Sequence, residues 1–400
     1  MSIRISYTRF VFSFIVLFEA MTIFLATFVP NLENKLYLVM LICLYIFYLK
    51  KIALKNLKSL IVVHTLLVVY IGWIILNQGM YFVFHLDFYA FVGFALTLLI
   101  FSRYEILEAL NEYLYKNVKL VILSNVVFFL ILAISIPLRG GLHTGFNMGI
   151  PILYGPYSIP HDVAYECLFL YCLNGVMYKR IRQTKFLIFK CLCLVCIVWT
   201  ATRSAFVAMA ILVFIDYCAY RNKKKKYLLF MVTIIGVMYL GLFTDFLISN
   251  PITQKTIAAM RDTGTISNSR GYFATSALNG YIKNTNTIQK LLGMGIEGVR
   301  STLKNDPLIK VPIHAHNDYI NTLCGYGIIG FIILIIQQCR LIPIWNKLKY
   351  SLIAEIFLFI LLYTNGLAMY CIVHPLIPIL FIFIDVCCNS RLRGALDEKK

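Results

Sequence analysis

Two histidines lie close together in the segment His314-Ala315-His316-Asn317-Asp318-Tyr319, directly before an apolar run. A neutral imidazole, with an ordinary pKa of about 6.5, can accept a proton from a hydroxyl group at neutral pH. We therefore expect His316 to project from the mouth of a helix into a site. Helical spacing would align three further side chains with it, Tyr319, Ile320 and Leu323. The alternative is a histidine that only caps or anchors the helix.

Two arginines occupy positions where a cation needs an anion. Arg203 lies in the turn Thr202-Arg203-Ser204 between two apolar runs of about 35 residues together, fewer than the about 40 that two full bilayer crossings need. A guanidinium at that depth costs roughly 2.5–3.5 kcal/mol unless an anion pairs with it, although it could also snorkel to headgroup phosphates. Arg270 opens an amphipathic stretch, where its guanidinium and unpaired backbone N–H groups could hold phosphate oxygens. Most exposed loop arginines are solvated, and Arg300 is interpreted in that way.

Neither the glycine motif nor the cysteines of the chain predict a cofactor or a metal. The segment Gly293-Met294-Gly295-Ile296-Glu297-Gly298 has the spacing of a dinucleotide-binding loop, but no strand precedes it and no βαβ unit follows. We interpret its glycines as a tight loop against the membrane surface. Cys191, Cys193 and Cys196 stand in an apolar run at offsets that splay thiols apart on a helix, where hydrated metal has no route of entry.

The elements that would position these residues are transmembrane helices. Of the 400 residues 60% are hydrophobic and 14% are charged, which is too apolar for a soluble surface. Apolar stretches near the length of a crossing lie at 9–29, 36–49, 59–77, 84–101, 118–137, 162–178, 186–201, 204–220, 227–248, 318–338, 351–370 and 372–388. We expect an all-α, polytopic membrane protein of about twelve transmembrane helices. Carboxylates in or beside these helices, Glu19, Glu166 and Asp216 among them, are candidates for a functional role, and most lie near an interface. Only Glu19 is expected near the centre of the membrane, as a proton relay or as an interhelical hydrogen-bonding group.

Lys and Arg cluster in alternate loops, which predicts the orientation because cytoplasmic loops retain positive charge. The clusters put both termini in the cytoplasm, while the short outer turns hold only Lys35, Arg139 and Arg203. The net charge of +19 follows this pattern and forms no basic face, so nucleic acid is not an expected partner. We predict helices one to nine over 1–249, a large periplasmic loop over 250–317, and helices ten to twelve with a cytoplasmic tail over 318–400. A helix after Ser269 should lie on the membrane surface.

The layout and the local motifs together resemble the bacterial O-antigen polymerase and O-antigen ligase superfamily. The ligase side of that family carries a His-Asn pair, nine residues, Gly, two residues and Gly, which His316-Asn317, Gly327 and Gly330 match. It also has an arginine in a Thr/Ser-Arg-Ser/Gly turn, a Ser-Arg arginine early in the large outer loop, and a Gly-x-Gly element before the histidine. The matching residues are Arg203, Arg270, Gly293 and Gly295. The resemblance covers roughly 160–330, and the first half only in topology.

The resemblance implies a fold similar to lipid-dependent membrane glycosyltransferases and a metal-independent, inverting glycosyl transfer from an undecaprenyl-diphosphate-linked glycan. Arg203 and Arg270 would hold the donor diphosphate, and His316 would activate the acceptor hydroxyl. Substrate binding is assigned to His314, Asn317, Tyr319, Arg139, Gly293 and Gly295. The expected location is the bacterial inner membrane with a periplasmic active face. Expected partners are lipid-linked oligosaccharides and membrane lipids, with a chain-length regulator protein as a further candidate.

Three functions compete at this point. A polymerase would extend a second lipid-linked repeat unit and is favoured by the His-Asn-Asp-Tyr sequence and by the poorly matched N-terminal half, whereas a ligase would transfer the glycan to lipid A-core. A transporter or flippase of lipid-linked glycans is the alternative from another class. It would place charges at mid-depth along several helices and show repeat symmetry, but this chain concentrates its charges at the outer mouth.

Overall fold

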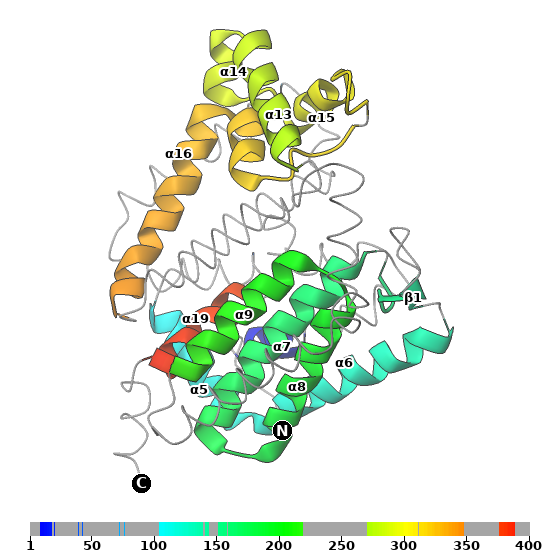
Figure 1. The fold of residues 1–400 in the computed structure, drawn as a ribbon. Helices are drawn as coiled ribbons and strands as arrows, with labels where there is room; N and C mark the ends of the chain where they lie inside the picture. The colour runs from blue at the N-terminus through cyan, green and yellow to red at the C-terminus, as the bar shows by residue number, and fades with distance from the viewer. Residues whose placement is uncertain are drawn as a thin grey trace, which may run out of the picture.

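A computed structural model describes residues 9–17, 20, 39, 42, 72, 76, 104–138, 141–143, 151–157, 159–218, 270–310, 312–347 and 376–388. Over these ranges the chain is mostly helical, as an all-α protein should be (Figure 1). The helices are α5 (Tyr104–Lys116), α6 (Val118–Leu138), α7 (Pro160–Ile181), α8 (Thr184–Trp199), α9 (Arg203–Cys218), α13 (Arg270–Asn284), α14 (Thr287–Leu292), α15 (Ile296–Lys304), α16 (Asp318–Lys347) and α19 (Leu376–Cys388). Strands β1 (Leu142–His143) and β2 (Ile152–Leu153) form one short antiparallel pair.

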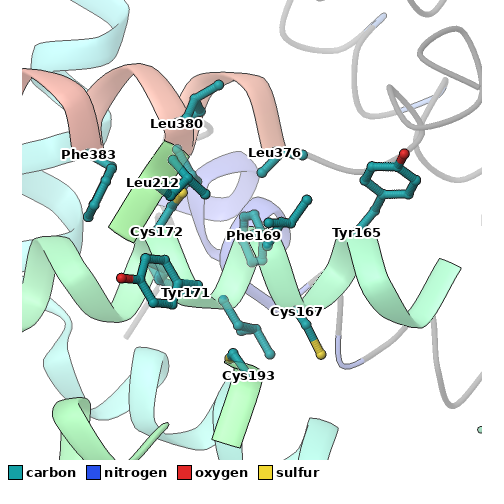
Figure 2. Packing of buried hydrophobic residues seen from close by; sticks show 14 of the residues in the cluster. Tyr165, Cys167, Phe169, Tyr171, Cys172, Cys193, Leu212, Leu376, Leu380 and Phe383 are labelled. Carbon is teal, nitrogen blue, oxygen red and sulfur yellow. The ribbon is translucent and has the colours of Figure 1, made fainter. Parts of the chain in front are cut away.

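Helix α7 is the centre of a helical bundle. It begins with Pro160, whose fixed φ suits a first helical position, and it carries Asp162 in its first turn and two cations in its last turn, as the helix dipole favours. An unbroken run, 163–177, is buried. Figure 2 shows Leu376, Leu380 and Phe383 of α19 on one side of α7 and Cys193 of α8 on the other. Because protein covers α7 on every side, it accommodates the polar residues Glu166 and Asn174.

Two described helices are long and apolar enough to cross a membrane, over Val118–Pro137 in α6 and Asp318–Ile336 in α16. Both were predicted as crossings. Helices α8 and α9 have 16 residues each, about 24 Å, so the α8–α9 hairpin is shorter than a hydrocarbon core of about 30 Å, as expected of a sunken hairpin. Helix α5 was not predicted. The proposed crossings near 36–49, 59–77, 84–101, 227–248 and 351–370 lie wholly or mostly outside the described residues, as does most of 9–29.

The described part of the long segment between α9 and α16 folds into a small helical unit with its own core. Helices α13, α14 and α15 lie at one end of α16, above the bundle in Figure 1. Ala277 and Tyr281 of α13 are buried there against Val299 and Leu303 of α15. The expected helix after Ser269 is therefore present. Part of its apolar face packs on α15 and α16, through Ala277, Tyr281, Phe273 and Leu278, whereas Tyr272 and Ile282 are exposed. A position of this helix on the membrane surface stays a prediction.

A kink divides α16 and joins it to this loop unit. Gly327 has φ 70° and ψ −174°, a conformation available only to glycine, and this breaks the helical hydrogen-bond ladder. The carbonyls of Cys324 and Gly325 accept hydrogen bonds from the N–H groups of Met294 (3.0 Å) and Gly295 (2.9 Å). A Cβ on Gly327 would lie 2.4 Å from the backbone nitrogen of Gly293. The two glycine motifs of the sequence therefore fit against each other, and the contact holds the loop unit on α16.

Candidate functional site

Arg203 is the first residue of α9 and follows a tight turn. Ala201 in that turn has φ 52°, a left-handed conformation that is costly for a residue with a Cβ. It is fully buried against Ile152 of β2, and the indole N–H of Trp199 donates to the carbonyl of Pro151 over 3.1 Å. The strand pair and the residue before β2 thus pack against this turn and stabilise it. Strained backbone is often found at functional sites, so the turn supports a role for Arg203.

Arg270 is the first residue of α13 and lies close enough to Arg203 for the two charges to act on each other. Two helix N-termini from distant parts of the sequence thus bring together two guanidinium groups. Burial lowers the pKa of Arg270, and the nearby Tyr165 partly opposes that shift. Both helix ends also present the positive end of a helix dipole. This cationic pair is suited to an anion with several oxygens, such as a diphosphate.

Tyr165 connects the two arginine-bearing elements, and the sequence reading missed it. Its side chain is 1% exposed on α7, and its hydroxyl lies 3.2 Å from the hydroxyl of Ser204, the neighbour of Arg203. On the next residue of α7, the buried carboxylate of Glu166 accepts a hydrogen bond from the hydroxyl of Tyr157. No spacing rule identifies Tyr165 in the sequence, because it stands in an apolar run with several other aromatic residues.

His316 lies against α13, one helical turn from Arg270. Its imidazole ring centroid is 5.7 Å from that of Phe273. Its backbone has φ 51°, so it stands outside α16, which begins at Asp318. Asn317 caps that helix by accepting the N–H of Ile320 over 3.2 Å. The three residues predicted to form the cationic cleft, two arginines and this histidine, are therefore neighbours around the start of α13.

The expectation that one helical face aligns His316 with Tyr319 and Leu323 is wrong. Because His316 precedes the helix in a left-handed conformation, helical spacing does not apply to it. Tyr319 packs on the bundle core and contacts the ring of Phe331 at 6.4 Å between centroids. Leu323 packs instead on the core of the loop unit, with Ile320.

The remaining predicted site residues have separate surroundings. Asn317 is buried at the start of α16, and Gly293 and Gly295 lie in the backbone contact with the kink. The side chain of His314 contacts Arg300, whose Nη2 lies 2.8 Å from Nε2 of the imidazole. The interpretation of Arg300 as a solvated cation is wrong, because this side chain is held between two partners. Arg139 lies outside the described residues.

The cysteines of α8 are arranged differently from the prediction that all three thiols splay apart. Cys191 is exposed, whereas Cys193 and Cys196 both face the buried Cys167 of α7. Offsets of three residues return to the same helical face, and the burial of α7 brings the third thiol to them. Within the described residues no group of three or more His, Cys, Asp or Glu side chains is arranged to hold a metal ion.

Residues 188–335 match the family model described as O-antigen ligase. The matched range contains Arg203, Arg270, His316 and both glycine motifs, but neither the start of α7 nor the strand pair. No curated protein and no solved structure matches the chain. The match and the apolar helices together indicate a membrane protein.

Proposed function

We propose that this chain, whose residues 188–335 match the O-antigen ligase family model, is an O-antigen polymerase. It transfers a glycan from undecaprenyl diphosphate to a hydroxyl group of a second lipid-linked repeat unit. The reaction takes place at the periplasmic face of the bacterial inner membrane, with both termini in the cytoplasm.

The observation that carries the proposal is the meeting of Arg203 and Arg270 beside the histidine turn. A lipid diphosphate leaving group gains negative charge as its bond to the sugar breaks. Two guanidinium groups at two helix N-termini stabilise that charge where it develops. Because this stabilisation is stronger in the transition state than in the ground state, it lowers the activation barrier. A sunken α8–α9 hairpin suits a ligand whose phosphates lie at headgroup depth.

His316 acts as the general base in this proposal. The acceptor hydroxyl oxygen attacks the anomeric carbon, and its proton moves to the imidazole of His316. The bond between the anomeric carbon and the phosphate oxygen breaks on the opposite face, so the configuration inverts and undecaprenyl diphosphate leaves with the bonding electron pair. The ring contact with Phe273 holds the imidazole one turn from the arginine that binds the leaving group.

The deciding experiment separates the chemistry of His316 from its backbone conformation. Asparagine tolerates a left-handed φ but cannot accept a proton, so His316→Asn preserves the turn and removes the base. We expect transfer by the purified protein to fall by about 100-fold or more. His316→Ala should lose at least as much activity. Full activity of His316→Asn, with normal membrane insertion, would remove His316 from the mechanism.

An O-antigen ligase is the second candidate, and the description of the matching family model favours it. Both enzymes use the same donor and differ in the acceptor, so the same cleft serves either. The lipopolysaccharide of a deletion strain distinguishes them. A core that bears one repeat unit indicates a lost polymerase, and a bare core with accumulated lipid-linked polymer indicates a lost ligase.

A further inference from the structure

Arg300 of α15 joins two side chains that the proposed mechanism does not use. Its Nη1 lies 2.8 Å from Oε1 of Glu297, and its Nη2 lies 2.8 Å from Nε2 of His314. The Arg300 side chain is only 21% exposed. The contact with His314 is therefore partly shielded from water, which strengthens it relative to an exposed hydrogen bond.

The chemistry of arginine determines the protonation of His314. A guanidinium has N–H donors only and stays charged at any physiological pH. Nε2 of His314 must therefore be the acceptor in this hydrogen bond, and the ring proton is on Nδ1. A second proton would make Nε2 a donor facing another donor, beside a fixed positive charge. His314 is thus held neutral, with its available lone pair already engaged.

Helix α15 is fixed firmly enough to impose this arrangement. Val299 and Leu303, on either side of Arg300 in the sequence, are fully buried in the core of the loop unit. At the start of α15 the N–H of Gly295 donates to the carbonyl of Gly325 beside the kink of α16. On the other side of His314, the N–H of Ala315 donates to the side-chain oxygen of Asn321 over 3.0 Å. Both ends of the contact are therefore attached to ordered structure.

We propose that Arg300, held by Glu297, is a positioning residue that keeps His314 as a neutral Nδ1–H donor and so assigns the proton-accepting role in this segment to His316. His314 then donates a hydrogen bond to a sugar hydroxyl or to its own segment and takes no proton during transfer. These separate roles of His314 and His316 rest on the proposed function, because they concern which histidine receives the proton of the acceptor hydroxyl.

A matched pair of substitutions tests whether His314 and His316 have these different roles. The amide N–H of asparagine can replace the Nδ1–H donor, but the amide cannot act as a base. His314→Asn should retain kcat within about tenfold, whereas His316→Asn should lose about 100-fold or more. The reverse order, or an equal and large loss in both variants, would overturn the inference.

Arg300→Met tests the positioning role, with Lys304→Met as its control one turn further along α15. Arg300→Met should lower kcat by between about 10- and 100-fold without raising the donor KM, because the histidine segment is misplaced while the diphosphate site is intact. Arg300→Lys should recover part of that loss through its single ammonium donor. Lys304→Met should leave both constants unchanged. An unchanged kcat in Arg300→Met, or a raised donor KM alone, would contradict the role.

The tautomer of His314 can be measured without any transfer activity. Nitrogen-15 spectra of histidine-labelled full-length protein in lipid nanodiscs, assigned with His314→Asn, should show a neutral Nδ1–H ring for His314 at pH 6. A charged ring at that pH would overturn the inference even if glycan transfer proceeds. A neutral ring in a protein that transfers no glycan would count against the proposed function and leave the assignment of Arg300 standing.

Discussion

At the scale of single residues, the two arginines of the site differ from the other described cations because each is the first residue of a helix. At these positions the proposed diphosphate would meet each guanidinium group together with the positive end of a helix dipole. Lysine carries the same charge as a point and lacks the planar fork that binds two phosphate oxygens at once. The geometry of the donor group, beyond its charge, should therefore matter here.

Arg203→Lys should accordingly impair transfer although the net charge is unchanged. The loss of one hydrogen bond to a charged group is worth about 1.5–3 kcal/mol, which corresponds to roughly 10- to 150-fold in kcat/KM for the donor. The control is Arg182→Lys at the exposed C-terminal end of α7, where no change is expected. Wild-type activity of Arg203→Lys would instead favour an arginine that snorkels to headgroup phosphates.

The sequence indicated which residues are candidates for the site, but it did not indicate which side chains they contact. His316, Arg203 and Arg270 were identified because each combines a reactive group with a position at the end of an apolar run. Arg300 and Tyr165 were not identified, because their roles arise from contacts between segments far apart in the chain. A cation in a polar loop gives no local signal that it faces a histidine 14 residues later.

At the scale of elements, the kink of α16 is the feature on which the loop unit depends. Gly327→Ala forces a Cβ to within 2.4 Å of the backbone of Leu291 and Gly293, at a φ of 70°. Neither neighbour is a flexible side chain that could move aside. The substitution should therefore separate α14 and α15 from α16, which lowers the melting temperature and abolishes transfer.

Gly271→Ala on α13 is the matched control, since a Cβ at that position meets nothing within 4 Å. In a helix the change should stabilise by about 0.5–1 kcal/mol, because alanine loses less backbone entropy than glycine. Thermal unfolding of the solubilised protein and limited proteolysis of the loop compare the two variants. Equal melting temperatures for Gly327→Ala and wild type would show that the kink can form without glycine.

Helix positions were predictable where apolar residues recur over a long stretch. The elements that pack against each helix were not predictable. Helices α6, α9, α13 and α16 follow their predicted stretches, because a buried or lipid-facing stripe dominates each sequence. Helices α14 and α15 have six and nine residues and give no such signal. The apolar stripe of α13 predicted burial but not what covers it, since lipid and protein select the same side chains.

At the scale of the whole molecule, the site joins two separate hydrophobic cores. One core belongs to the bundle around α7, and the other belongs to the loop unit of α13, α14 and α15 with the start of α16. Arg203 comes from the bundle, and Arg270 and His316 come from the loop unit. The proposed site therefore requires both cores to fold, although neither the arginines nor the histidine contributes much to either.

The bundle is held at its other end by a buried ionic cluster. Asp216 of α9 is in ionic contact with Lys190 of α8 and, over 2.9 Å, with Lys179 of α7. All three side chains are less than a tenth exposed. The ammonium of Lys190 also lies 4.7 Å from the ring centroid of Tyr171. One carboxylate thus compensates two cations from two other helices, and its loss should be far more costly than the loss of either lysine.

Asp216→Asn would leave two buried ammonium groups without a compensating charge and should cost about 3–5 kcal/mol of stability. Lys190→Met should cost much less, because the Lys179–Asp216 pair remains and the buried net charge falls to zero. Melting temperatures in detergent measure both variants, and equal values would show that the cluster is not shielded from water. Asp216 lies about 20 Å along α9 from Arg203. The folded fraction of each variant should therefore keep its specific activity, because the substitutions lower the stability of the bundle and leave the proposed site at the Arg203 end unchanged.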